Sequence, residues 1–182
     1  MSRPASVEGR ERLRLFCALR LPGEVLDAIV AWGDNHLRER IVSRTNLHIT
    51  LAFLGHRPAE ELDSIVAATG EAAAGAAPIR LEAVRYRETR SVGMLVLSDE
   101  GDAATRLAED LHGRLEALAV YERERRRWLP HLTVVRFRQR PRLEPPLPEL
   151  GSFSPSDAAV YLSRLRPGGA RYEVVQSFAL GG

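Results

Sequence analysis

Two segments of this sequence repeat one short pattern, a histidine and a threonine separated by a single aliphatic residue. The two copies are Asn46-Leu47-His48-Ile49-Thr50-Leu51 and Pro130-His131-Leu132-Thr133-Val134. Both lie in runs of β-branched and aliphatic residues, which favour β-strands. One such copy would be an ordinary accident of sequence. Two copies in matching contexts, with His48 and His131 83 positions apart, indicate a functional pair.

Alternation along a strand places the two polar residues of each copy on the same face. Side chains of a strand point alternately to opposite faces, so His48 and Thr50 share one face, and His131 and Thr133 share another. The other face of the first copy would enter a core, and it comprises Leu47, Ile49, Leu51 and Phe53. If the two strands pack with their polar faces opposed, two histidines and two threonines line one cleft.

The remaining pattern predicts a mixture of strands and helices. Strands are expected over residues 12–19, 47–54, 78–87, 93–97, 129–137, 158–165 and 172–180. Helices are expected from Pro22, from Pro58 and over residues 104–118, with a proline-rich loop over residues 141–155. This order gives an α/β or α+β fold. Because a strand, a helix and a histidine-bearing strand recur in the second half, we expect residues 1–182 to form one domain of two similar lobes.

Paired imidazoles and hydroxyls suit acid–base chemistry on a phosphate. One imidazole can remove a proton from the attacking oxygen while the other protonates the leaving oxygen. Histidine serves both roles because its ordinary pKa of about 6.5 lies near neutral pH. The threonine hydroxyls can donate hydrogen bonds to phosphate oxygens. A zinc site is a weaker interpretation, because neither segment has a carboxylate at ligand spacing.

Composition excludes several other classes of protein. All 26 basic residues are arginine. Without lysine the chain cannot be a P-loop nucleotidase, a lysine-adenylating ligase or a Schiff-base enzyme. Cys17, the single cysteine, rules out an internal disulfide and is expected to be buried and inert. The net charge of +2 suits an anionic substrate. No apolar run reaches the roughly 18 residues of a membrane span, and the polar segment Met1–Arg12 has no signal-peptide core, so we expect a cytoplasmic protein.

Most of the chain resembles the LigT-like RNA 2′,3′-cyclic phosphodiesterases, also called the 2′-5′ RNA ligase family, of the two-histidine phosphoesterase superfamily. The resemblance rests on four segments, Leu13–Leu19, Asn46–Gly55, Pro130–Arg136 and Val160–Leu165 followed by Gly169–Tyr172. The chain departs from the family before the first motif, where Ile41-Val42-Ser43-Arg44 lacks the tryptophan often found there. This departure concerns the wall of the substrate site rather than the histidine pair.

The resemblance implies both a fold and an activity. The fold would be α+β, with two pseudo-symmetric lobes, each an antiparallel sheet with helices packed outside, around a central groove. The activity would be metal-free hydrolysis of RNA 2′,3′-cyclic phosphate ends to 2′-phosphates. The resemblance assigns His48 as proton donor to the leaving O3′ and His131 as base on the attacking water, with Thr50, Thr133 and Arg136 binding the substrate. We expect no cofactor, no metal, no membrane and no obligate protein partner, and a monomer acting on RNA or oligonucleotide ends.

Some alternatives stay open from the sequence. Strict alternation puts Arg136 on the face opposite His131, so it reaches phosphate only if the strand bends or ends there. The arginines of residues 123–127 either steer RNA or form a solvated loop, the preferred interpretation. Aromatic residues that could stack on a base are more often core residues; they are Phe53, Tyr86 and Trp128. His36, His56 and His112 are expected at the surface.

Two other functions compete with hydrolysis. The same pair of histidines could join RNA halves through a 2′-5′ bond without ATP, because attack by a sugar hydroxyl in place of water reverses the cleavage. A non-catalytic RNA-binding module is also possible, but binding alone does not require paired imidazoles.

Overall fold

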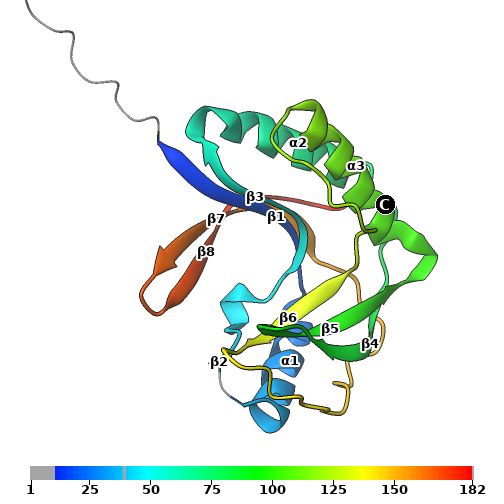
Figure 1. Cartoon of the computed structure of the whole chain (residues 1–182). Helices are drawn as coiled ribbons and strands as arrows, with labels where there is room; N and C mark the ends of the chain where they lie inside the picture. The colour runs from blue at the N-terminus through cyan, green and yellow to red at the C-terminus, as the bar shows by residue number, and fades with distance from the viewer. Residues whose placement is uncertain (1–10, 39, 182) are drawn as a thin grey trace, which may run out of the picture.

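Two antiparallel four-stranded sheets frame the structure, a computed structural model that describes residues 11–38 and 40–181 (Figure 1). The first sheet has the strand order β3-β1-β7-β8, with β1 at Arg12–Arg20, β3 at Ile49–Pro58, β7 at Asp157–Arg166 and β8 at Gly169–Phe178. The second has the order β2-β6-β5-β4, with β2 at Arg40–Ile41, β4 at Leu81–Glu88, β5 at Val92–Asp99 and β6 at His131–Arg136.

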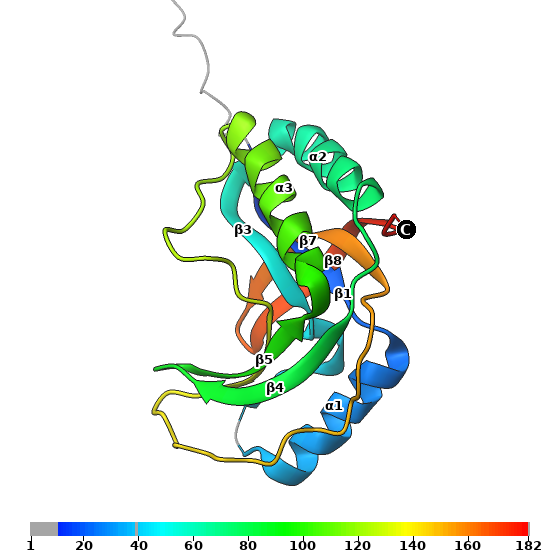
Figure 2. The same ribbon diagram turned by 90° about the vertical axis from the view of Figure 1, so that its right-hand side faces the viewer.

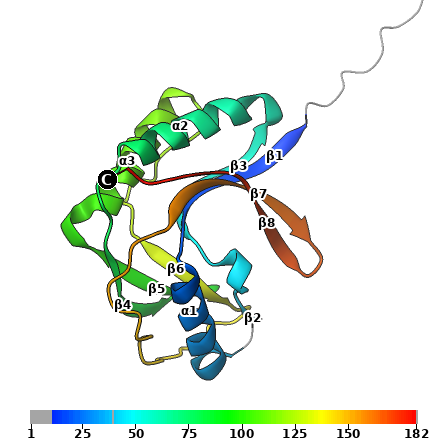
Figure 3. The ribbon, with the colours of Figure 1, turned by 180° about the vertical axis from the view of Figure 1, so that it is seen from behind.

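Helices cover the outer sides of these sheets. In the described part of the chain they are α1 at Gly23–His36, α2 at Leu62–Ala74 and α3 at Ala103–Ala117. Helices α2 and α3 pack side by side against the first sheet (Figure 2), whereas α1 lies beside the second sheet (Figure 3). The expected α+β class, with antiparallel sheets and helices outside them, is confirmed.

Most predicted elements form close to their expected positions, with one clear error. Pro22 is the N-cap of α1, where its lack of an N–H costs no helical hydrogen bond. Pro58 was expected to open the second helix, but it ends β3 opposite Arg12 of β1. Helix α2 begins four residues later, after a 3₁₀ turn at Ala59–Glu61. The long β1–β3 pairing extends the strand past the point where local propensity would stop it.

The central strand β1 is buried on both faces. Leu15, Cys17 and Leu19 belong to the main hydrophobic core, which also includes residues of α1, α2, α3 and both sheets. Phe16 points the other way and forms a separate small cluster with Tyr161. Their rings stack at 4.8 Å with an angle of 2° between the planes. This second cluster forms the floor beneath the first histidine.

Two expectations from the sequence concern the burial of Cys17 and the presence of membrane-spanning segments. Cys17 is fully buried, and burial raises the pKa of its thiol to about 11, which keeps the thiol protonated and unreactive. No helix among residues 11–38 and 40–181 is both long and apolar enough to span a membrane. Residues 1–10, which make up most of the polar N-terminal segment, lie outside the described residues.

Candidate active site

A groove of about 490 Å³ opens between the two sheets and the β7–β8 turn. The first sheet and the turn before β3 contribute Arg14, Phe16, Asn46, His48, Thr50 and Phe53. The second sheet and the segment after β2 contribute Arg40, Ile41, Val42, Ser43, Thr133 and Arg136. The β7–β8 turn contributes Gly168, and β8 contributes Gly169, Ala170 and Tyr172. The groove therefore brings together one histidine, both motif threonines and three arginines.

His48 sits just before β3 with both ring nitrogens engaged. Its Nδ1 lies 2.7 Å from the carbonyl oxygen of Asn46, and its Nε2 lies 3.0 Å from the hydroxyl of Thr50. Because a carbonyl only accepts, Nδ1 carries the proton and donates it, which leaves Nε2 to accept from Thr50 in the neutral ring. The ring also packs against two aromatic rings: its centre lies 4.8 Å from that of Phe16 and 5.4 Å from that of Tyr172. Nε2 is thus the reactive nitrogen, and its direction is fixed.

His131 repeats the arrangement at the first residue of β6. Its Nδ1 lies 2.8 Å from the carbonyl oxygen of Leu129, again two residues upstream, so its Nε2 is also the free nitrogen of the neutral ring. His131 is not among the residues that line the groove, although Thr133 is. The two imidazoles are close enough for a charge on His131 to lower the pKa of His48.

Each motif is followed by a β-bulge directly after its threonine. In the β1–β3 ladder, Ala18 pairs with Thr50 and Cys17 pairs with Ala52, so Leu51 is the extra residue. In the β5–β6 ladder, Met94 pairs with Thr133 and Gly93 with Val135, so Val134 is the extra residue. An extra residue shifts the alternation that follows it by one position.

The bulges bring the fifth residue after each histidine into the groove. Phe53 was predicted to point into the core with Leu51, but this is wrong, because the bulge turns it outward and its side chain is 50% exposed. Arg136 reaches the groove by the same shift, which answers the objection that strict alternation raised. The two sheets thus offer equivalent positions with different chemistry, an aromatic ring at Phe53 and a guanidinium at Arg136.

Burial and positive charge together keep His48 neutral. Desolvation by the surrounding rings is the largest cause, and the charges of Arg136 and His131 act in the same direction. The hydrogen bond to the Asn46 carbonyl opposes them, and the resulting pKa is lowered to about 4. A groove with this charge favours an anionic ligand, since a negative group would relieve the repulsion.

We predict that His48 makes stability depend on acid pH. Its pKa is about 4 in the folded chain and about 6.5 in the unfolded chain. The unfolded state therefore binds more protons between these two pH values. The contribution of His48 to the free energy of unfolding is complete above pH 6.5 and is lost as the pH drops toward 4. Because the ring keeps some contact with water, we expect a loss of about 2 kcal/mol.

The measurement is denaturant unfolding of the wild type and His48→Gln at several pH values. The difference in free energy of unfolding between the wild type and His48→Gln should shrink by this amount between pH 6.5 and pH 4. His56→Gln, at an exposed position of β3, should show the same pH dependence of unfolding as the wild type. Parallel pH profiles for the wild type and His48→Gln would contradict the assignment.

Several residues considered from the sequence lie outside the groove. Arg123, Arg126 and Arg127 are exposed and form ion pairs with Glu116, Glu124 and Asp102. The preferred interpretation of a solvated loop describes them better than steering into the groove. His36 and His56 are exposed as expected.

Three of the considered residues have structural contacts instead. His112 was expected at the surface, but it is 6% exposed, because α3 packs it against β3, where its Nε2 donates to the Leu51 carbonyl. Tyr86 is half-buried and donates its hydroxyl proton to Glu88. Trp128 donates its indole N–H to the Thr50 carbonyl.

The structure also adds residues that sequence reasoning did not select. Arg14, Arg40 and Tyr172 line the groove, and the guanidinium of Arg14 lies 4.7 Å from the centre of the Phe53 ring. Arg14 could have been found from the sequence, because it lies two residues before Phe16 on β1 and therefore shares its face of the strand. No local signal marked Tyr172, because β8 reaches His48 only through the sheet. Ile41, Val42 and Ser43, where the family often has a tryptophan, form a wall of short side chains.

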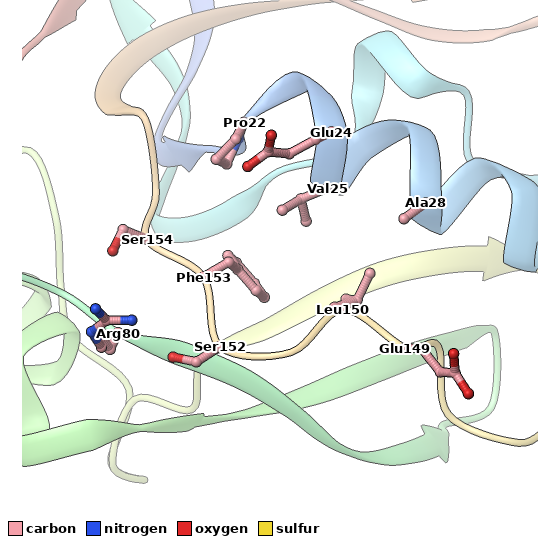
Figure 4. A pocket seen from close by; sticks show the side chains of 10 residues that line it. All are labelled: Pro22, Glu24, Val25, Ala28, Arg80, Glu149, Leu150, Ser152, Phe153 and Ser154. Carbon is pink, nitrogen blue, oxygen red and sulfur yellow. The ribbon is translucent and has the colours of Figure 1, made fainter.

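A second cavity, of about 530 Å³, lies at the start of α1 (Figure 4). The loop before β7 forms its other side with Glu149, Leu150, Ser152, Phe153 and Ser154. Arg80, Glu24 and Glu149 are the charged residues in it, and its described lining holds no histidine or motif residue. Although it is slightly larger, it lacks the paired groups that acid–base chemistry requires.

The fold and the groove together define a class of protein. Its members are α+β proteins in which two antiparallel sheets each carry one His-x-Thr strand, with both threonines directed into a shared basic groove. The sequence profile of the 2′-5′ RNA ligase superfamily matches residues 21–166. The chain belongs to this superfamily.

Similar proteins of known name and structure agree with this placement. An RNA 2′,3′-cyclic phosphodiesterase of Thermus thermophilus is 33% identical over 93% of this chain and 91% of its own length. One of Escherichia coli is 27% identical over 93% of this chain and 98% of its own. Escherichia coli LigT in complex with 3′-AMP superposes with a TM-score of 0.80 at 26% identity, covering 94% of this chain and 100% of LigT. The Thermus thermophilus structure TT0787 gives a TM-score of 0.77 at 32% identity over 93% of this chain and 99% of its own.

Proposed function

We propose that this protein is an RNA 2′,3′-cyclic phosphodiesterase that opens the cyclic phosphate to a 2′-phosphate by acid–base catalysis with His48 and His131. One imidazole takes a proton from water, whose oxygen attacks phosphorus in line with the P–O3′ bond. That bond breaks, and the other imidazole protonates O3′. The product carries a 2′-phosphate and a free 3′-hydroxyl. The reaction needs no cofactor.

The observation that carries this proposal is the matched geometry of the two motifs. Each imidazole donates Nδ1–H to a backbone carbonyl two residues upstream, so both present Nε2 as the reactive nitrogen. Thr50 and Thr133 line the groove together with His48, and Arg136 adds a charged donor for phosphate oxygens. Relatives over nearly the whole chain carry the name of this activity. LigT was crystallised with 3′-AMP and with phosphate, ligands of the kind this groove would hold.

The catalytic pair must hold one proton between its two members. The free protein keeps His48 neutral, which suits a base, whereas family resemblance assigns it as the acid. An anionic phosphate bound beside the pair favours a protonated, positively charged imidazole, so either ring can carry the proton in the complex. Because the two sites are coupled, a bell-shaped pH profile reports the pair rather than one residue.

We propose that Phe53 and Arg14 bind the nucleoside part of the substrate. Phe53 is half-exposed in the groove, and an aromatic ring there can stack on any base. The Arg14 guanidinium covers the Phe53 ring and also donates to the buried hydroxyl of Ser163 at 2.7 Å. These contacts hold the platform in one place before the substrate arrives.

Residues 1–182 are proposed to act as one domain, since a single main core includes residues of both sheets. We also propose that the protein works as a monomer in the cytoplasm on oligonucleotide ends, without a metal or an obligate partner.

Product analysis tests the activity directly. A short RNA ending in a 2′,3′-cyclic phosphate should give a 2′-phosphate in the presence of the protein. Adding a second RNA with a 5′-hydroxyl separates hydrolysis from 2′-5′ joining, which would give a longer product instead. A 3′-phosphate product would show that the P–O2′ bond breaks and that the substrate sits the other way round. An unchanged RNA would contradict the proposal.

We predict that hydrolysis survives an excess of EDTA. Among residues 11–38 and 40–181, no group of three or more His, Cys, Asp or Glu side chains is placed to hold a metal ion. The rate should stay within about twofold of its value without chelator, because both proton transfers use imidazoles. Loss of activity in EDTA that one divalent metal restores would overturn the metal-free mechanism.

A further inference from the structure

The bulge after the first motif is held by two side chains from the second half of the chain. The carbonyl of Thr50 accepts the indole N–H of Trp128 at 3.0 Å, and the next carbonyl, of Leu51, accepts Nε2–H of His112 at 2.7 Å. A bulge interrupts the regular ladder, so the carbonyls beside it need other donors. His112 comes from α3 and Trp128 from the segment that leads into β6. The shape of the first motif therefore depends on the part of the chain that carries the second.

The Trp128 bond joins the two motifs by a short path. Thr50 lies two residues after His48, and Trp128 lies three residues before His131. Trp128 is half-buried and packs against the main core, so this packing holds its indole in one position. Movement of Thr50 would also move its hydroxyl away from Nε2 of His48, to which it is now bonded at 3.0 Å.

We propose that Trp128 is a positioning residue for the reaction, and that its indole N–H fixes Thr50, and through it His48, relative to the strand of His131. Trp128 is absent from the groove lining, so it acts through the Thr50 backbone and not on the substrate. This inference rests on the proposed function for its kinetic test. Its structural consequence can be measured on the free protein.

The chain offers a matched control for the test. Trp32 of α1 also donates its indole N–H to a distant backbone carbonyl, that of Pro146, at 2.8 Å, and it is absent from the groove. Trp128→Phe and Trp32→Phe each keep an aromatic ring and remove one such bond. Both should lower Tm by a few degrees. Only Trp128→Phe should also lower kcat, about tenfold with KM within about twofold, because a misplaced group acts on the transition state.

A double-mutant cycle with Thr50→Val shows whether Trp128 acts through Thr50. If it does, Trp128→Phe should cost little more in the Thr50→Val background, whereas independent effects would multiply. His112→Phe removes the neighbouring donor, which binds the Leu51 carbonyl in the same bulge. It should therefore displace the bulge in a second way and cause the same loss of kcat. This variant keeps the proposal testable if Trp128→Phe does not fold.

Titration of the His48 ring by NMR gives a readout that needs no substrate. Loss of the Thr50 hydroxyl from Nε2 removes a donor that favours the neutral ring, so the pKa of His48 should rise in Trp128→Phe and in Thr50→Val. It should not change in Trp32→Phe. Multiplying effects on kcat, or an unchanged His48 pKa in Trp128→Phe, would overturn the inference. If the wild type opens no cyclic phosphate, the proposed function fails, and the NMR result alone decides the role of Trp128.

Discussion

His48→Ala and His131→Ala should each lower kcat by roughly 10²- to 10⁴-fold, the usual contribution of one general acid or base. KM should change much less, because Arg136 and both threonines still line the groove. The double variant should be little worse than the poorer single variant, since the two rings work as a unit. Steady-state kinetics on a cyclic-phosphate RNA give both values.

Two further histidines serve as controls for this experiment. His36→Ala and His56→Ala change exposed residues that do not line the groove, so both should keep kcat within about twofold. Near-wild-type turnover in either His48→Ala or His131→Ala would refute the two-histidine assignment.

The same variants can separate the acid from the base. A substrate with an activated leaving group needs little protonation, so it should rescue the variant that lacks the acid far more than the variant that lacks the base. Family resemblance predicts rescue of His48→Ala. Rescue of His131→Ala instead would assign His48 as the base, the role that its lowered pKa in the free protein suits. The reaction class would be the same in both cases.

Arg136→Gln should lower kcat/KM by about 10- to 100-fold, the usual value of a hydrogen bond to a charged group. The guanidinium lines the groove and is exposed, so it can donate to phosphate without a large desolvation cost. The same variant should raise the pKa of His48, because the charge of Arg136 is one cause of its lowering. Steady-state kinetics and NMR titration measure the two effects.

Arg138→Gln is the matched control for Arg136. It removes the same charge two residues further along, from an exposed side chain that does not line the groove. If the two variants lost activity equally, the effect would come from the net charge of the protein rather than from a phosphate contact.

Local sequence was enough to predict most of the elements and the catalytic candidates. The repeated motif identified His48, Thr50, His131 and Thr133 because alternation in a strand is a local property. The hydrophobic periods of α1, α3 and the strand pairs likewise follow from side chains near in sequence. The prediction failed at Pro58, where pairing with Arg12 keeps the strand going. That pairing joins residues 46 positions apart, so the residues around Pro58 alone do not indicate it.

Only the tertiary structure decided which residues share the groove with the motifs. A bulge depends on register with a partner strand, so the sequence of β3 alone could not show that Leu51 is the extra residue or that Phe53 turns outward. The same reasoning applies to Arg136 on β6. His112 likewise became a buried donor because α3 packs on β3. The sequence by itself determined the chemistry of the two motif strands, and long-range register determined what surrounds that chemistry, because strand pairing and side-chain packing depend on residues far away in the chain.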